Sequence, residues 1–124
     1  LLFARADLID FWRQIDHARL GVAKNYLLYP NPWPKPGHLQ RRWHGHPVFP
    51  TLATLSSELI LRTNWEIYAQ EFYAALNFLI SLGRLQGTSD FRLICPESPI
   101  SRFEKKYLES DHQLFEVVFS KERK

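Results

Sequence analysis

A loop rich in proline carries the side chains of this sequence that are best suited to chemistry. Residues 30–37 read Pro-Asn-Pro-Trp-Pro-Lys-Pro-Gly, so an amide (Asn31), an indole (Trp33) and an ammonium (Lys35) alternate with prolines. Proline fixes φ and removes a backbone donor, so such a loop loses little entropy on ordering and holds its polar side chains at fixed angles. These groups could hydrogen-bond to a flat heterocycle, stack on it and neutralise a nearby anion. The loop is therefore the predicted ligand site.

Positive charge is concentrated around this loop. No Asp or Glu occurs in residues 17–57, whereas five Lys or Arg residues and four of the five histidines lie there. A surface of one sign attracts polyanions, and release of counterions makes the binding salt-sensitive. A solvated positive surface with no partner is the alternative. The side chains predicted to line a strip that binds the backbone of such a polyanion are His38, Arg41, Arg42 and His44.

The strands that position the loop follow from the apolar runs. Residues 22–29 predict a central, buried strand that stops at Pro30, so its carboxyl end opens into the loop. Ligands bind at that edge in open α/β sheets. Three further strands are predicted over residues 58–63, 91–95 and 114–119.

Helices are predicted between these strands. Asp7 stands at the N-cap of a helix that Gly21 would end. A second helix over residues 50–57 would turn Leu52 and Leu55 inward. The third and clearest helix has apolar residues at three- and four-residue spacing from Trp65 to Leu79 and ends at Gly83. Capping-box spacing is found at Thr63 with Glu66, and at Ser101 with Glu104.

Composition limits the class of protein. The 124 residues, of which 45% are hydrophobic, predict one α/β domain with an antiparallel edge at the carboxyl end of the chain. No apolar run approaches the ~18 residues of a membrane helix. The single Cys95 fits a reducing, cytoplasmic setting and is expected in the core. We expect no metal at His44-Gly45-His46, because no carboxylate lies nearby. The absence of methionine indicates a fragment.

Three segments resemble, in the same order, segments of the bacterial tRNA (guanine-N7)-methyltransferases. Residues 29–35, followed by His38 and Arg41-Arg42, resemble the Pro-Asp-Pro-Trp-Pro-Lys…His…Lys-Arg-Arg stretch of that family. Residues 63–68 resemble its Thr-Asp-Trp-Glu-x-Tyr, and residues 101–104 its Thr-Lys-Phe-Glu. The resemblance covers nearly the whole chain but only the second half of the family.

This resemblance implies a fold and an activity. It implies a Rossmann-like, S-adenosylmethionine-dependent methyltransferase sheet that is incomplete here, with strands from the third onward. Residues 1–124 would be the carboxyl-terminal part of a single methyltransferase domain. The five glycines are dispersed, so the glycine-rich cofactor loop is absent from this chain. The parent protein would transfer a methyl group from S-adenosylmethionine to N7 of a tRNA guanine, and this fragment alone would be inactive.

The resemblance also implies roles for individual residues. Asp7, in an Arg-x-Asp setting, would contact the adenine end of S-adenosylmethionine, a role compatible with capping a helix. Asn31, where the family has Asp, would bind the cofactor and be catalytic. Asn64 also replaces an Asp of the family. The implied substrate-binding residues are Lys35, Asn64, Ser101, Arg102, Phe103 and Glu104.

The chemistry leaves two alternatives open. Guanine N7 has a free lone pair and no proton, so its methylation needs orientation rather than a general base. An Asn at position 31 offers the Watson–Crick edge of guanine one acceptor and one unwanted donor. The Asn-Pro-Trp run also resembles the Asn-Pro-Pro-aromatic loop of amino-methyltransferases, in which the Asn accepts bonds from an exocyclic amino group. The other alternative is a non-catalytic RNA-binding homologue. The sequence does not predict an oligomeric state.

Overall fold

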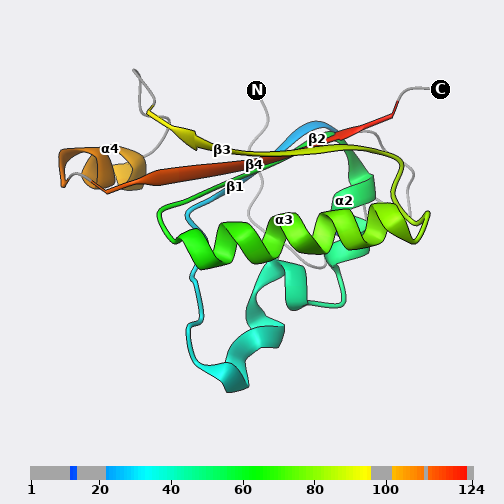
Figure 1. Cartoon of the computed structure of the whole chain (residues 1–124), viewed down its shortest axis with the longest axis horizontal. Coiled ribbons are helices and arrows are strands. Elements are labelled where there is room, and N and C mark those ends of the chain that lie inside the picture. The colour runs from blue at the N-terminus through cyan, green and yellow to red at the C-terminus, as the bar shows by residue number, and fades with distance from the viewer. Residues whose placement is uncertain (1–11, 14–21, 96–101, 111, 123–124) are drawn as a thin grey trace.

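The computed structural model describes residues 12–13, 22–95, 102–110 and 112–122. Its four strands form one sheet in the order β1-β2-β4-β3 (Figure 1). They are β1 (Val22–Leu28), β2 (Ser56–Thr63), β3 (Gly87–Ile94) and β4 (Leu114–Lys121). β1 and β2 run parallel, whereas β4 is antiparallel to both of its neighbours. The predicted α/β class and the antiparallel edge are therefore confirmed.

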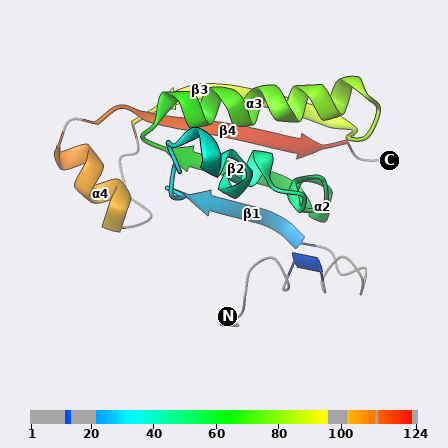
Figure 2. The same ribbon diagram turned by 90° about the horizontal axis from the view of Figure 1, so that it is seen from below.

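The helices lie on one face and at one end of the sheet. α2 (Phe49–Leu55) and α3 (Glu66–Ser81) pack on the same face, and α4 (Arg102–Glu109) lies at the end of the sheet towards which β1 and β2 point (Figure 2). Two short 3₁₀ segments, η1 (Pro36–Arg41) and η2 (Trp43–Gly45), connect the loop to α2. None of the described helices has both the length and the apolar character needed to cross a membrane.

The core lies between α3 and the middle of the sheet. The buried stripe of α3 consists of Tyr68, Ala69, Phe72, Leu76 and Leu79, as its spacing predicted. It belongs to one cluster with Leu59, Leu61, Val117 and Phe119 of β2 and β4 and with Leu52 and Leu55 of α2. Each large apolar side chain buried in this way contributes roughly 1.5–3 kcal/mol. α3 ends before Gly83, whose φ of 73° is in the left-handed region that glycine favours.

Two predictions about burial are wrong. β1 is not central: in the described sheet it is an edge strand that pairs only with β2, and Tyr26 is 45% exposed. Among the residues of this strand whose side chains the structure describes, only Leu27 is buried in the core. Cys95 is exposed rather than in the core, because it follows β3, the strand at the opposite edge. An apolar run of residues predicts that a strand forms, but it does not predict where in the sheet the strand lies.

The predicted capping box at the start of α3 is also wrong. The N-cap is Trp65, and no side chain caps it. The Thr63 hydroxyl instead accepts a hydrogen bond from the Trp65 N–H at 3.1 Å, and the Glu66 carboxylate accepts one from Gln70 at 3.2 Å. Thr63 therefore shapes the turn from β2 into α3 rather than closing a box. The cap predicted at Asp7 lies outside the described residues, and so does Ser101 of the second predicted box.

Candidate functional site

The segments that follow β1 and β2 meet α4 at one end of the sheet. The Tyr29 N–H, just after β1, donates to the Arg62 carbonyl oxygen of β2 at 2.7 Å. The Tyr29 hydroxyl donates to Glu104 Oε2 of α4 at 2.6 Å, and the Tyr29 ring lies 5.2 Å from that of Tyr107. Asn64 follows two residues after Arg62. The proline-rich loop, the residue 63–68 segment and α4 are thus brought to one edge.

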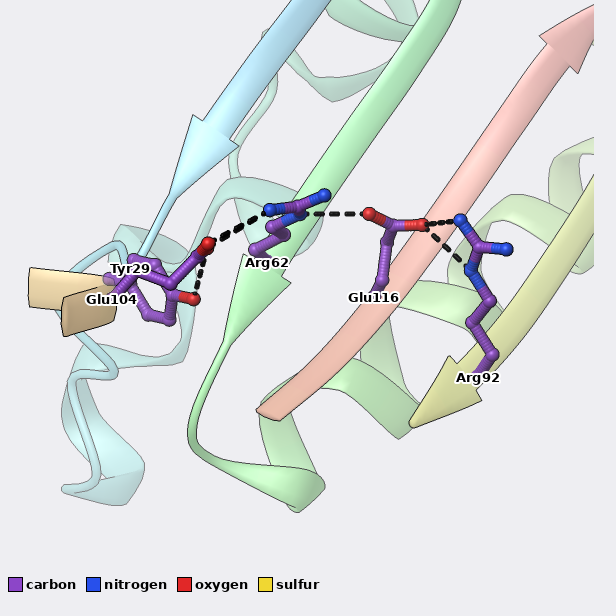
Figure 3. A network of polar contacts seen from close by, with 5 residues as sticks. All are labelled: Tyr29, Arg62, Arg92, Glu104 and Glu116. Carbon is purple, nitrogen blue, oxygen red and sulfur yellow. Dashed lines mark hydrogen bonds and ion pairs between the residues drawn. The ribbon is translucent and has the colours of Figure 1, made fainter. Parts of the chain in front are cut away.

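A buried ionic network joins these elements (Figure 3). Arg62 donates to both carboxylate oxygens of Glu104 at 3.1 Å and to Glu116 Oε2 at 2.8 Å. Arg92 donates from Nε to Glu116 Oε1 at 2.8 Å. The side chains of Glu104 and Glu116 are 0% and 3% exposed. A buried carboxylate is tolerated only when it is paired, so the two arginines make this network possible.

The protonation of the network follows from burial and from its hydrogen bonds. Burial alone would lower the pKa of Arg62, but the hydrogen bonds to Glu116 and Glu104 outweigh it and the pKa is raised. Burial, together with the bond to Glu104, raises the pKa of the Tyr29 hydroxyl. Both groups therefore hold their protons across the physiological range.

The proline-rich loop presents its polar groups outward. The Asn31 Oδ1 accepts a hydrogen bond from the Trp33 N–H at 3.2 Å, and the side chains of Asn31 and Lys35 are exposed. Tyr29 and Trp33 have φ angles of 50° and 45°, in the left-handed region. The Arg41 guanidinium lies 4.8 Å from the centre of the Trp33 ring. The loop thus displays an amide, an ammonium and a cation stacked on an indole.

A pocket of about 520 Å³ lies beside this loop, within the range typical of small-molecule sites. Its walls come from β1, the loop, the 3₁₀ segments and α3. The residues that line it are Tyr26, Leu27, Leu28, Pro30, Asn31, Trp33, Arg41, Trp43, His46 and Tyr68. Aromatic side chains with a few convergent polar groups can hold a heterocycle in one orientation.

Two members of the predicted RNA-backbone strip are turned inward. Arg42 is 4% exposed and pairs with Glu71 at 2.5 Å. The side chain of His44 is 10% exposed, and its Nε2 lies 2.9 Å from the same carboxylate. Burial lowers the pKa of His44 despite this contact with Glu71. In these positions neither side chain can reach a phosphate, so the sequence-based interpretation of Arg42 and His44 needs correction. His38 and Arg41 stay at the surface or partly exposed.

The remaining predicted site residues have mixed positions. The Asn64 Nδ2 lies 3.1 Å from His112 Nδ1, just before β4, and Arg102 is exposed at the start of α4. Glu104, predicted to bind substrate, has its carboxylate inside the ionic network. Asp7 and Ser101 lie outside the described residues, as does the side chain of Phe103. Within the described part of the chain, no group of three or more His, Cys, Asp or Glu side chains could hold a metal ion.

Sequence reasoning did not find the residues that tie the site together. Tyr29, Arg62, Arg92 and Glu116 were not singled out, although all four belong to the ionic network. One sign was present in the pattern: Glu116 is a charged residue inside the apolar run of residues 114–119, and Arg62 directly follows the apolar run of residues 59–61. Charges at such positions are usually paired when they are buried.

Curated proteins support the resemblance of the three segments. No family model matches the chain. A tRNA (guanine-N(7)-)-methyltransferase of Leifsonia xyli is 33% identical over 102 residues, which are 79% of this chain and 44% of the relative. A protein of the same name from Ralstonia pickettii is 33% identical over 77% of this chain and 38% of its own length. Another from Acinetobacter baylyi is 26% identical over 94% of this chain and 48% of its own length. The chain spans less than half the length of these relatives. Over the part that it spans, the chain is a partial match to the tRNA (guanine-N(7)-)-methyltransferase family.

Proposed function

We propose that this chain is the carboxyl-terminal part of an S-adenosylmethionine-dependent tRNA (guanine-N7)-methyltransferase that acts in the cytoplasm. The observation that carries the proposal is the meeting of three segments at one edge of the sheet. The loop after Tyr29 and the turn after Arg62 are joined by a backbone hydrogen bond, and α4 is joined to both through Glu104. Segments that are far apart in the sequence and share one edge can act on one ligand.

The orientation of Asn31 supports guanine N7 as the acceptor of the methyl group. Its Oδ1 accepts a hydrogen bond from the Trp33 N–H at one of its two acceptor positions, whereas both Nδ2 donors can face a ligand. Guanine presents O6 and N7 as acceptors side by side on one edge. We assign to Asn31 a hydrogen bond to O6, which would hold N7 in place without blocking its lone pair. An amino-methyltransferase would need the Asn oxygen as acceptor, and one of its two acceptor positions is already in use.

The residues of this chain would orient the base and exclude water. S-adenosylmethionine, when bound, supplies an electrophilic methyl group on a sulfonium, and N7 needs no base to react with it. The pocket beside the loop provides aromatic walls, including Trp33 and Trp43, for one of the two planar ligands. Asp7 would contact the cofactor. Because the glycines of this chain are dispersed, the glycine-rich turn that holds the cofactor would come from another part of the parent protein.

Contacts to the RNA would come from the exposed side chains. Lys35 and Arg41 are exposed and His38 is partly so, and they would meet phosphates beside the target base. Asn64 and Arg102 would contact substrate from the second and third segments. We place Ser101 and Phe103 there as well, on the resemblance alone. Glu104 would act on the substrate only through the network that fixes α4.

The test uses the protein from which this chain comes. It is mixed with S-adenosylmethionine labelled in its methyl group and with bulk tRNA, and the tRNA is then digested to nucleosides and separated. We expect the label in 7-methylguanosine. We also expect Lys35→Ala to weaken tRNA binding and to reduce the slope of log K against log salt concentration by about one. Lys121→Ala, at the far end of β4, is the matched control.

Two results would replace the proposal. Label in an N-methylated exocyclic amino group would favour the amino-methyltransferase alternative. Salt-dependent tRNA binding without any transfer of label would favour a non-catalytic RNA-binding homologue. Absence of both transfer and binding would refute either form of RNA-directed function.

A further inference from the structure

We propose that Arg42 is a positioning residue that locks the proline-rich loop onto α3 and thereby sets the place of Asn31 relative to Asn64. This inference rests on the proposed function, because it gives Arg42 a part in orienting the target base. It differs from the expectation that Arg42 contacts RNA. The side chain makes its contacts inside the molecule and touches two of the three segments at the site.

The loop is short of hydrogen-bond donors, and Arg42 supplies them. Its Nε donates to the carbonyl oxygens of Pro32 at 3.0 Å and Trp33 at 3.2 Å. Four of the seven residues from 30 to 36 are prolines, which have no N–H to offer. Unpaired carbonyls beneath the loop would cost free energy wherever water cannot reach them. A guanidinium has five donors in a planar fork and can satisfy such a cluster.

The other end of the guanidinium is fixed to α3. Its Nη1 donates to Glu71 Oε1 at 2.5 Å, and its Cζ lies 5.0 Å from the centre of the Trp65 ring. Trp65 is the N-cap of α3 and directly follows Asn64. The same Glu71 oxygen lies 2.9 Å from His44 Nε2, so the carboxylate that receives Arg42 is itself held by a second side chain.

Electrostatics keeps this arrangement in one state at neutral pH. Partial burial alone would raise the pKa of Glu71, but hydrogen bonds from His44 and Arg42 outweigh it and the pKa is lowered. Burial lowers the pKa of His44, so its ring is neutral and does not compete as a cation. Arg42 is therefore the cation that faces Glu71, and its 4% exposure leaves little room for another geometry.

The neighbouring arginine shows why the role belongs to Arg42. Arg41 is exposed and lies over the outer face of the loop, against the Trp33 ring. Arg42 lies beneath the loop and binds its backbone. One arginine is thus placed to meet the ligand, and the other to hold the surface that the ligand meets.

The experiment separates positioning from binding. The protein is labelled with 5-fluorotryptophan, and the ¹⁹F resonance of Trp33 is assigned through Trp33→Phe. We expect Arg42→Met and Arg42→Lys to shift or broaden this resonance, because methionine has no donor and the lysine ammonium lacks the planar fork that reaches the two carbonyls from Nε and Glu71 from Nη1. In single-turnover methyl transfer at saturating tRNA, we expect a roughly 10- to 100-fold slower step, since misplacing a reacting group by about 1 Å costs that much.

Matched variants give the opposite pattern. Arg41→Met should weaken tRNA binding and make that binding less dependent on salt, because it removes a cation at the surface of the loop. Arg84→Met, an exposed arginine far from the loop, should leave the Trp33 resonance unchanged. If Arg42→Met does not fold, Arg42→Lys and Glu71→Gln carry the test, because both keep the volume of the side chain close to the original.

The outcomes separate this inference from the proposed function. If the unmodified protein transfers no methyl group but the Arg42 variants still move the Trp33 resonance, the proposed function fails and the role of Arg42 in holding the loop stands. If the unmodified protein is active and the Arg42 variants keep its transfer rate, the positioning role is overturned, whether or not the resonance moves. An unmoved resonance together with a slower rate also overturns it.

Discussion

Replacing Arg62 with methionine tests whether the ionic network holds the edge of the sheet together. Arg62 faces two buried carboxylates, Glu104 at 3.1 Å and Glu116 at 2.8 Å. Removing one partner of a buried ion pair costs roughly 3–5 kcal/mol, because a charge is left without compensation. We expect about 3 kcal/mol here, since the side chain of Arg62 is 18% exposed and Glu116 keeps its bonds to Arg92. Domains of this size are stable by only about 5–15 kcal/mol, so the loss is large.

Urea denaturation followed by circular dichroism measures this loss. The midpoint should fall while the slope of the free energy against urea stays unchanged. The double variant Arg62→Met with Glu104→Gln should recover at least about 1 kcal/mol relative to Arg62→Met alone. A neutral amide at position 104 still accepts the Tyr29 hydroxyl but no longer buries a charge that lacks its cation.

Arg92→Met is the matched control. Its guanidinium binds the same Glu116, but the side chain is 60% exposed. Exposed ion pairs contribute ~0–1 kcal/mol, so this variant should lose less than about 1 kcal/mol. Equal losses in Arg62→Met and Arg92→Met, or no recovery in the double variant, would refute the view that burial of the carboxylates makes Arg62 essential.

Three further predictions concern stability. Tyr29→Phe should lower the free energy of unfolding by about 1.5–3 kcal/mol, because it removes a hydrogen bond to a buried carboxylate, and urea denaturation measures this. Burial lowers the pKa of His44, so near its ordinary value of 6.5 the unfolded chain takes up a proton that the folded chain does not. The free energy of unfolding should therefore fall as pH falls from about 7 to about 5, and His44→Gln should flatten that slope. Gly87→Ala should lower the melting temperature, because its Cβ would overlap a backbone carbonyl of β4, whereas Gly37→Ala meets no atom within 4 Å and should not.

The regular elements could be predicted because their patterns are local. The apolar spacing from Trp65 to Leu79 lies within one helix, and the runs that became β2 and β4 have no breakers. The position of a strand in the sheet is not local. β1 reads as an apolar run but lies at one edge of the sheet formed by the four described strands, and the exposure of Cys95 depends on β3 being the other edge of that sheet. The place of a strand in the sheet and the exposure of the residue after it are set by which other strands pair with it, not by the residues of the strand itself.

The site could be predicted in part for a similar reason. The proline-rich loop is visible in the sequence because proline restricts its own backbone. The network beneath it joins residues that are far apart in the sequence. Glu104 bonds to Arg62, which is 42 positions earlier, and to Tyr29, which is 75 positions earlier, and no spacing rule pairs such residues. The adjacent Arg41 and Arg42 look alike in the sequence. Which of them turns inward depends on the 3₁₀ turn of η1, which ends between them.

The network and three of the predicted site residues are related by a fixed offset in the chain. In each of the three segments, a residue of the network stands two positions from a predicted site residue: Tyr29 from Asn31, Arg62 from Asn64, and Glu104 from Arg102. Two residues span only about 7 Å even in an extended chain, so fixing the first leaves the second little freedom. The three inner side chains bond to one another through Glu104. The buried Glu104 carboxylate therefore holds the three segments at one edge, and the contacts of Arg42 with the loop and with α3 act together with it to bring the outer groups within reach of one flat ligand.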